Sequence, residues 1–174
     1  VYNRKLAFIE AEQRIRTCYR PYHQALKQLI EETRERFGFC ILLDCHSMPS
    51  SAVAPQPREL KKNQDGKLSR RIDIVLGDCH GTSSDPRIVE LIEGQFQSHE
   101  LLVRRNHPYA GGFITRHYGR PAKGVHTVQI EMNRALYLDE ATMEVTKGAT
   151  RLSHNMSAVI SGLGVLLAGD AKLA

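Results

Sequence analysis

The sequence predicts an α/β fold, a three-layer sandwich in which helices cover both faces of a mainly parallel mixed sheet. Two observations favour this class. Short apolar runs of strand length alternate along the chain with longer segments of helical periodicity. The run at residues 39–43 is apolar throughout, which is typical of a strand buried on both faces of a parallel sheet.

The longest helical pattern precedes this strand. Apolar side chains recur at mostly three- and four-residue steps from Lys5 to Phe37. Pro21 interrupts the pattern because it lacks an amide hydrogen, and we expect either a kink or two abutting helices there. Gly38 suits the left-handed position that ends many helices.

Further strands and helices follow in alternation. Their composition predicts strands at residues 72–76, 101–103 and 127–131. Asp85 is expected to cap a helix that begins at Pro86. Residues 139–167 are predicted to form one long helix or two, whereas the polar stretch at residues 49–71 predicts a long loop.

Composition narrows the class of protein. The chain has 174 residues and a net charge of +5, from 24 Lys and Arg against 19 Asp and Glu, and it predicts a single domain over residues 1–174. The basic residues are scattered and no nucleic-acid-binding motif is present, so we expect no nucleic-acid partner. No apolar stretch reaches the roughly 18 residues of a membrane span, so we expect no membrane partner. Four cysteines without a C-x-x-C pair or a visible signal peptide predict a cytoplasmic protein.

The strongest chemical motif is Asp44-Cys45-His46, at the carboxyl end of the apolar run. Ligands of open α/β sheets bind at this end of the strands. Side chains two residues apart on a strand project to the same side, so Asp44 can orient the ring of His46 for metal binding. The motif makes His46 a candidate metal ligand supported by Asp44, but taken alone it favours a structural role. A histidine that caps a turn is the alternative.

A second carboxylate ends a later predicted strand. Gln129 and Glu131 should share one face of that strand, and Val128 the other. A carboxylate near a metal at the end of a strand can take a proton from a bound water, which makes Glu131 a candidate general base. An ion pair between Glu131 and Arg134 is the alternative.

Polar side chains surround the glycine pair Gly111-Gly112. Asn106, Arg116 and Tyr118 are the candidates for binding a small polar anion there, with Arg116 as the natural bidentate partner of a carboxylate. A glycine-rich turn with a wet surface is the alternative. Glycine-rich loops of ATP and NAD sites and the nucleophile elbow of serine hydrolases are absent from the sequence.

Taken together, these segments resemble the N-formylglutamate amidohydrolase family, also called N-formylglutamate deformylases. The resemblance lies in the order and spacing of four motifs, at residues 43–47, 73–77, 111–119 and 129–134, and residues 19–23 fit the family's helix before the first strand. It implies a fold similar to zinc carboxypeptidases and aspartoacylase. It also implies one zinc ion and hydrolysis of N-formyl-L-glutamate to formate and glutamate, in histidine degradation.

The resemblance assigns roles to individual residues. It implies that His46 is a zinc ligand, that Glu131 is the general base, and that Arg116 and Tyr118 bind substrate carboxylates. It further implies that a His and a Glu ahead of the long helix complete the zinc site. We therefore expect this chain to be the C-terminal part of a longer enzyme, in which an upstream segment adds a strand beside residues 43–46. A non-catalytic binding domain or a degenerate relative on the same scaffold is the alternative function.

Overall fold

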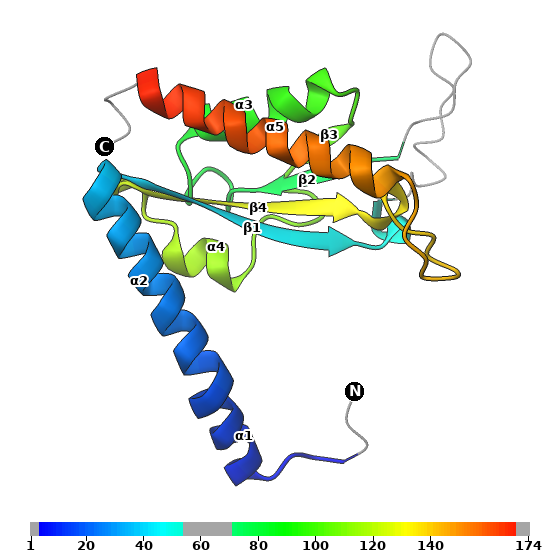
Figure 1. The fold of residues 1–174 in the computed structure, drawn as a ribbon. Helices are drawn as coiled ribbons and strands as arrows, with labels where there is room; N and C mark the ends of the chain where they lie inside the picture. Colours follow the sequence, from blue (N-terminus) through cyan, green and yellow to red (C-terminus); the bar gives the residue numbers. More distant parts are fainter. Residues whose placement is uncertain (1–3, 54–70, 170–174) are drawn as a thin grey trace.

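The computed structural model describes residues 4–53 and 71–169, which form a mixed α/β structure. Its sheet has four strands in the order β1-β4-β2-β3 (Figure 1). Their bounds are Cys40–Met48 for β1, Ile74–Gly77 for β2, Val103–Arg105 for β3 and Val125–Asn133 for β4. Strand β1 pairs parallel with β4, β4 pairs antiparallel with β2, and β2 pairs parallel with β3. The predicted mixed sheet is confirmed.

Helices lie on both faces of this sheet. Helices α3 (Pro86–Ser98) and α5 (Gly148–Gly169) cover one face, and α4 (Phe113–Tyr118) lies on the other (Figure 1). The main core lies between the sheet and the α3–α5 pair. Its fully buried side chains are Ile74, Leu76, Ile88, Val89, Ile92, Phe96, Val128, Ile130 and Val159.

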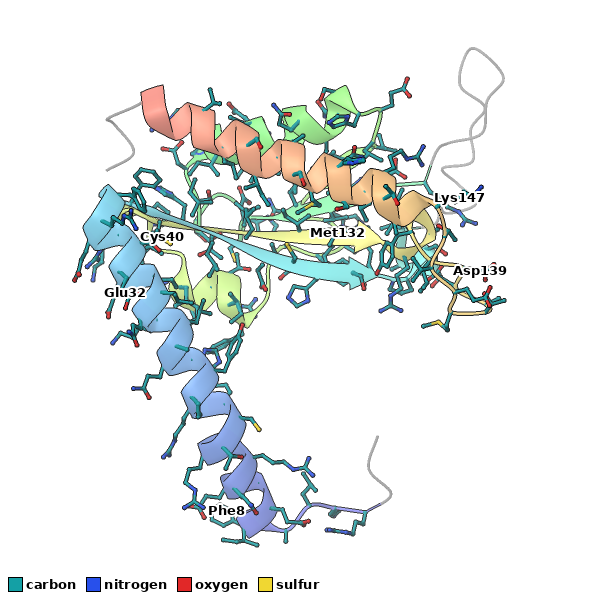
Figure 2. All side chains as sticks on the ribbon, viewed as in Figure 1. Phe8, Glu32, Cys40, Met132, Asp139 and Lys147 are labelled. Carbon is teal, nitrogen blue, oxygen red and sulfur yellow. The ribbon has the colours of Figure 1, made fainter. Side chains whose placement is uncertain are left out.

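The predicted N-terminal helix forms with one irregularity. It consists of α1 (Phe8–Arg14), a π-helical turn (Ile15–Tyr19) and α2 (Arg20–Phe37). The π turn ends two residues before Pro21, and the Arg20 amide donates to the Ile15 carbonyl five residues back. A proline ring clashes with the carbonyl four residues before it, and the wider turn relieves that clash. The start of this helix projects away from the sheet, as the separation of Phe8 from Cys40 shows in Figure 2.

The helix ends and the first strand begins as the sequence predicts. Gly38 has a left-handed φ of 83°, and its amide donates to the Arg34 carbonyl at 2.7 Å. The C-terminal half of α2 then packs on the α4 face of the sheet, where Ile30 joins Cys40 and Val125 in a small apolar cluster.

Two segments differ from the prediction. Residues 113–118 form α4, where the glycines had indicated a turn. Residues 139–147 form no helix, because the Asp139 carboxylate accepts hydrogen bonds from the amides of Ala141 and Thr142 and closes a turn. A β-bridge between Leu138 and Val145 completes that turn, and α5 begins only at Gly148.

The strand bounds differ as well: β2 and β3 each begin two residues later than predicted, and β1 and β4 are longer than their apolar runs. Strands β1 and β4 pair over nine residues each, which carries both into the polar residues that follow the runs. In the predicted loop, residues Ser50–Val53 form a 3-10 turn, and residues 54–70 lie outside the described part. Among the described residues, no helix has the length and apolar character needed to cross a membrane.

Helix α3 begins with the predicted cap. The Asp85 carboxylate accepts a hydrogen bond from the Arg87 amide at 2.9 Å, and the Arg87 guanidinium pairs with the same carboxylate at 2.9 Å. The hydrogen bond from the Arg87 side chain is the main cause that holds the pKa of Asp85 below its ordinary value. The cap therefore has two components: the hydrogen bond from the Arg87 amide and the ion pair with the Arg87 guanidinium.

Replacing Asp85 should separate these two parts. Asp85→Ala should lower the free energy of unfolding by about 1 kcal/mol, because the first turn of α3 loses its cap. Asp85→Asn keeps an accepting oxygen and should lose less. Since the folded pKa is depressed, the contribution of the charge is present above the unfolded pKa of about 3.9 and is lost as pH falls through the folded pKa. Urea unfolding at pH 7 and pH 3 measures both effects, and equal midpoints for Asp85→Ala and wild type at pH 7 would contradict them.

Candidate active site

One face of β4 is polar although the strand is central in the sheet. Val128 and Ile130 point into the core beneath α3 and α5. The alternate residues lie on the opposite face, that of α4, and all of them are buried: Thr127, Gln129, Glu131 and Asn133. Buried polar groups destabilise a fold unless they are hydrogen-bonded. A row of them along one face of a strand therefore indicates that this face has a role other than packing.

The neighbouring strand places His46 directly beside Glu131. In the parallel pairing of β1 with β4, His46 is opposite Glu131 and Asp44 is opposite Gln129. Paired residues project to the same face from strands about 4.8 Å apart. The two residues that the sequence singled out for chemistry are thus adjacent, on the face that carries α4.

Asp44 and His46 are joined by a hydrogen bond. The Nε2 nitrogen of His46 lies 3.1 Å from the Asp44 carboxylate, which accepts from it. The other ring nitrogen of His46, Nδ1, takes no part in this bond. The side chain of His46 is 50% exposed, so the ring does not lie in the apolar core.

Glu131 is held by a second polar side chain. The Gln129 amide donates from Nε2 to Oε1 of Glu131 at 2.8 Å, and the Gly112 backbone amide donates to Oε1 of Gln129 at 2.6 Å. Burial is the main cause that raises the pKa of Glu131 above its ordinary value, while His46 and Gln129 act in the opposite direction. A carboxylate with a raised pKa is suited to accept a proton and return it. Arg134, the alternative partner of Glu131, donates to the Ser47 hydroxyl at 3.3 Å, and its charge acts to lower the pKa of Glu131.

The loop that carries Gly112 rests directly on β2. A Cβ atom on Gly77 would lie 2.6 Å from the Gly111 nitrogen, so only glycine allows this approach. Gly111 itself has a φ of 122°, a conformation open to glycine alone. The Cys79 amide also donates to the Ala110 carbonyl at 2.7 Å. These contacts bring the Gly112 amide to Gln129.

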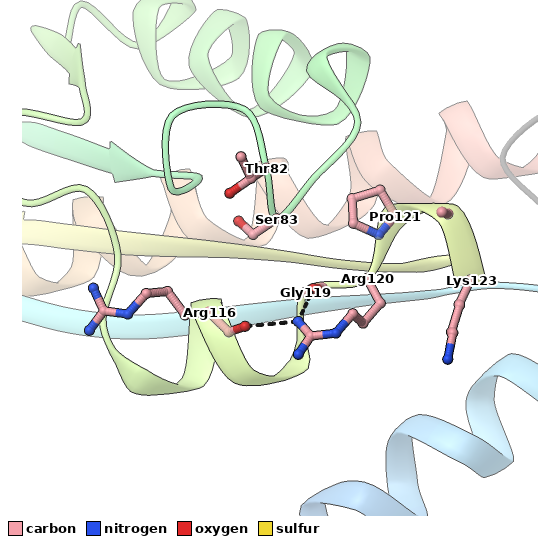
Figure 3. Close-up of a pocket in the computed structure, with 8 residues that line it drawn as sticks. Thr82, Ser83, Arg116, Gly119, Arg120, Pro121 and Lys123 are labelled. Atoms are coloured by element: carbon pink, nitrogen blue, oxygen red, sulfur yellow. Dashed lines mark hydrogen bonds between the residues drawn. The ribbon is translucent and has the colours of Figure 1, made fainter.

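Arg116 lies on α4 next to this loop. Its guanidinium is exposed and donates to the Gly111 carbonyl at 3.3 Å. Arg116 also lines a cavity of about 360 Å³ with Arg120 and Lys123. Figure 3 shows its guanidinium pointing away from those two basic residues. The position next to the loop that contacts Gln129 makes Arg116 the predicted substrate-binding residue most directly connected to Glu131.

The polar atoms of the other two predicted substrate-binding residues are bonded elsewhere. The Tyr118 hydroxyl lies 2.7 Å from Nδ1 of His23 on α2. The Asn106 side chain accepts from the amides of Asp78 and His80 and donates to the Asp78 carboxylate at 2.7 Å. These bonds attach Tyr118 to α2 and Asn106 to the neighbouring loop. Their roles in substrate binding stay predictions.

The described residues do not make a complete metal site. No three His, Cys, Asp or Glu side chains gather into a possible metal-binding set within residues 4–53 and 71–169. A catalytic zinc is usually held by three protein ligands. In this part of the chain, His46 is the one predicted ligand, so the described donor set alone does not fit zinc.

Comparison with known proteins places these residues in a family. The sequence model of the family described as N-formylglutamate amidohydrolase matches residues 1–138, which include His46, Arg116 and Glu131. The chain belongs to the N-formylglutamate amidohydrolase family. The predicted resemblance is therefore confirmed.

Two curated relatives carry the name N-formylglutamate deformylase. The one from Pseudomonas putida is 36% identical over 136 residues, which are 75% of this chain and 45% of the relative. The one from Pseudomonas aeruginosa is 33% identical over 138 residues, covering 75% of this chain and 46% of the relative. The chain thus spans about half the length of the curated relatives that it matches.

Solved structures agree with this placement. The crystal structure of N-formylglutamate amidohydrolase from Ralstonia eutropha JMP134 matches 95% of this chain and 56% of its own, with a TM-score of 0.78 and 36% identity. A gene product of Agrobacterium tumefaciens matches with a TM-score of 0.58 and 20% identity, covering 93% of this chain and 57% of its own. The second likeness concerns the fold alone.

Sequence reasoning missed two parts of the site. It placed Gln129 on the face of Glu131 but gave it no function, and it left His23 without a role. The alternation of the strand signalled the position of Gln129. Only the fold brings Gly112 to Gln129 and Tyr118 to His23, because each contact joins segments that are distant in sequence.

The close approach at Gly77 can be tested by substitution. Gly77→Ala should push the loop at residues 110–112 off β2, and we expect it to lower the free energy of unfolding by about 1–3 kcal/mol. Gly94→Ala is the matched control, because a Cβ there meets nothing within 4 Å and alanine favours the helix. Urea unfolding of both variants measures the difference. The packing account fails if the two substitutions shift the midpoint alike.

Proposed function

We propose that the protein carrying this chain hydrolyses the amide bond of an N-acyl amino acid, specifically N-formyl-L-glutamate to formate and L-glutamate, with zinc and within histidine degradation. The observation that carries this proposal is the pairing of the exposed His46 with the buried Glu131 on the polar face of the sheet, in a member of this family. The names of the two Pseudomonas relatives support the substrate.

Glu131 would act as the general base of this reaction. Its carboxylate would take a proton as a water oxygen attacks the formyl carbon, and it would then give that proton to the departing amine nitrogen as the C–N bond breaks. Burial favours the protonated form of Glu131, so the carboxyl group can hold the proton between the two transfers. Proton uptake and release balance over the cycle.

Arg116 would bind a carboxylate of the substrate. An exposed guanidinium can receive both oxygens of a carboxylate in parallel hydrogen bonds. Its contact with the Gly111 carbonyl keeps it next to the loop that touches Gln129. A substrate that carries carboxylates thus meets a cation on the same side of the sheet as Glu131.

Zinc dependence rests on family membership and on the position of His46. Asp44 would support this ligand through its bond to Nε2. The described residues supply one imidazole, so the remaining ligands would come from outside them. The zinc-carboxypeptidase-like architecture, and the place of this chain as one domain of a longer enzyme, belong to the same proposal.

Removing the proposed base should abolish most of the activity. Glu131→Gln keeps the shape of the side chain but cannot accept the proton, and turnover of N-formyl-L-glutamate should fall by roughly 10²–10⁴-fold. Glu90→Gln is the control, because Glu90 is an exposed carboxylate on α3, outside the site. Release of formate measures both rates. Near-normal turnover by Glu131→Gln would exclude the assigned role.

Metal content provides an independent test. We expect the 174-residue chain to bind zinc weakly, because a single imidazole competes poorly with water, and any longer product of the same gene to hold about one zinc ion. His46→Ala should reduce the zinc content of that longer product, whereas His99→Ala, at an exposed position after α3, should leave it unchanged. Elemental analysis of the purified proteins measures this. A full product without zinc and without hydrolysis would indicate a non-catalytic binding domain instead.

A further inference from the structure

Three groups form a hydrogen-bonded chain across the polar face of the sheet. The Gly112 amide donates to Oε1 of Gln129 at 2.6 Å, and Nε2 of Gln129 donates to Oε1 of Glu131 at 2.8 Å. A backbone N–H can only donate, so it must face the oxygen of the Gln129 amide. The NH₂ group must then face Glu131. The chemistry of the two neighbours permits this one orientation of the amide.

The Gln129 side chain is buried at a position where a strand needs no amide. Its exposure is 5%, and that of Glu131 is 7%. An apolar residue would satisfy the strand equally well, whereas a buried amide is destabilising unless both of its ends are bonded. The two ends of this amide have two partners, Gly112 behind it and Glu131 in front. The arrangement therefore indicates that the Gln129 side chain holds the Glu131 carboxylate in place.

The group behind Gln129 is itself fixed. Gly112 precedes the first turn of α4, and its carbonyl accepts from the Arg116 amide at 3.2 Å. The close contact of Gly77 with Gly111 sets the loop against β2. A Cβ on Gly112 would lie 3.2 Å from Oε1 of Gln129, so the amide and the loop are in close contact.

We propose that Gln129 is the positioning residue for Glu131, which it holds through Oε1 so that Oε2 is the oxygen that exchanges the proton. This inference rests on the proposed function and deepens it. Of the described residues, Gln129 alone donates a hydrogen bond to the Glu131 carboxylate. The proton from the attacking water is taken by Oε2 and later passes from Oε2 to the amine nitrogen.

A second consequence concerns the substrate. The same loop contacts Gln129 through Gly112 and the Arg116 guanidinium through the Gly111 carbonyl. Two consecutive residues thus support both groups: Gly111 contacts Arg116 directly, and Gly112 contacts Glu131 through Gln129. Displacement of a reacting group by about 1 Å can reduce a rate by about 10²-fold, so a common support for the two groups has a direct effect on turnover.

The test compares variants of the longer gene product that carries this chain and holds zinc. Gln129→Met keeps the length of the side chain and removes its donor, and kcat for N-formyl-L-glutamate should fall by about 10–100-fold, with KM changed by less than about threefold. Thr127→Val is the matched control: Thr127 is buried on the same face of β4, and its hydroxyl has no hydrogen-bond partner among the described residues. It should leave kcat unchanged. If Gln129→Met does not fold, Gln129→Asn serves, because the shorter amide cannot reach both neighbours.

A double-mutant cycle separates positioning from a structural effect. If Gln129 acts through the Glu131 carboxylate, Gln129→Met should lower the residual rate of Glu131→Gln by less than about threefold. An equal fold-loss in both backgrounds would assign Gln129 a structural role and overturn the proposal. A wild-type protein that does not release formate would instead overturn the proposed function, so the two failures are distinct.

A spectroscopic measurement tests the contact without turnover. The NMR signals of the Gln129 side-chain amide should move when Glu131 is replaced by Gln, since the accepting oxygen loses its charge. The side-chain amide of Asn133 is the internal control, because it lies on the same face but donates to the Ile72 carbonyl. Gln129 signals that move no more than those of Asn133 would show that the bond is absent, and the proposal would fail.

Discussion

The candidate site depends on the register between β1 and β4. These parallel strands pair from Cys40 opposite Val125 to the ends of both strands, and this register puts His46 beside Glu131. A shift of one residue would turn Glu131 toward the core beneath α3 and α5 and would bring Val128 and Ile130 to the polar face. The burial of those apolar side chains opposes the shift. Hydrophobic packing on one face of the sheet therefore determines the geometry of polar groups on the other.

The polar face is stable because supporting backbone reaches it from two directions. The loop before α4 supplies the Gly112 amide to Gln129, and Asn133 is bonded to the Ile72 carbonyl and the Ala135 amide. Each of these bonds satisfies a buried amide that would otherwise destabilise the fold. Glycine at position 77 admits the loop, since any side chain there would meet its backbone. The site thus requires the absence of a side chain at Gly77 on β2 as well as the functional groups on β4.

Much of the framework could be predicted from the sequence. The capped start of α3 at Asp85, the end of α2 at Gly38 and the shared face of Gln129 and Glu131 follow from local chemistry. The errors have local causes as well. Helix α4 was not predicted because it is short and begins after two glycines, which are typical of a turn. The first part of the helix predicted from residue 139 is a turn instead, because the Asp139 side chain bonds amides that a helix would use.

The sequence by itself determined where α2 ends, where α3 begins and which face of a strand the candidate residues occupy, because alternation and capping are properties of neighbouring residues. The tertiary structure decided which of them meet. It placed His46 beside Glu131 and bonded Gln129 to Gly112, and it directed Asn106 toward Asp78 and Tyr118 toward His23. These contacts depend on strand register and on loops that pack against distant segments. No local pattern specifies them, because their partners lie far away along the chain and meet only when the hydrophobic core has formed.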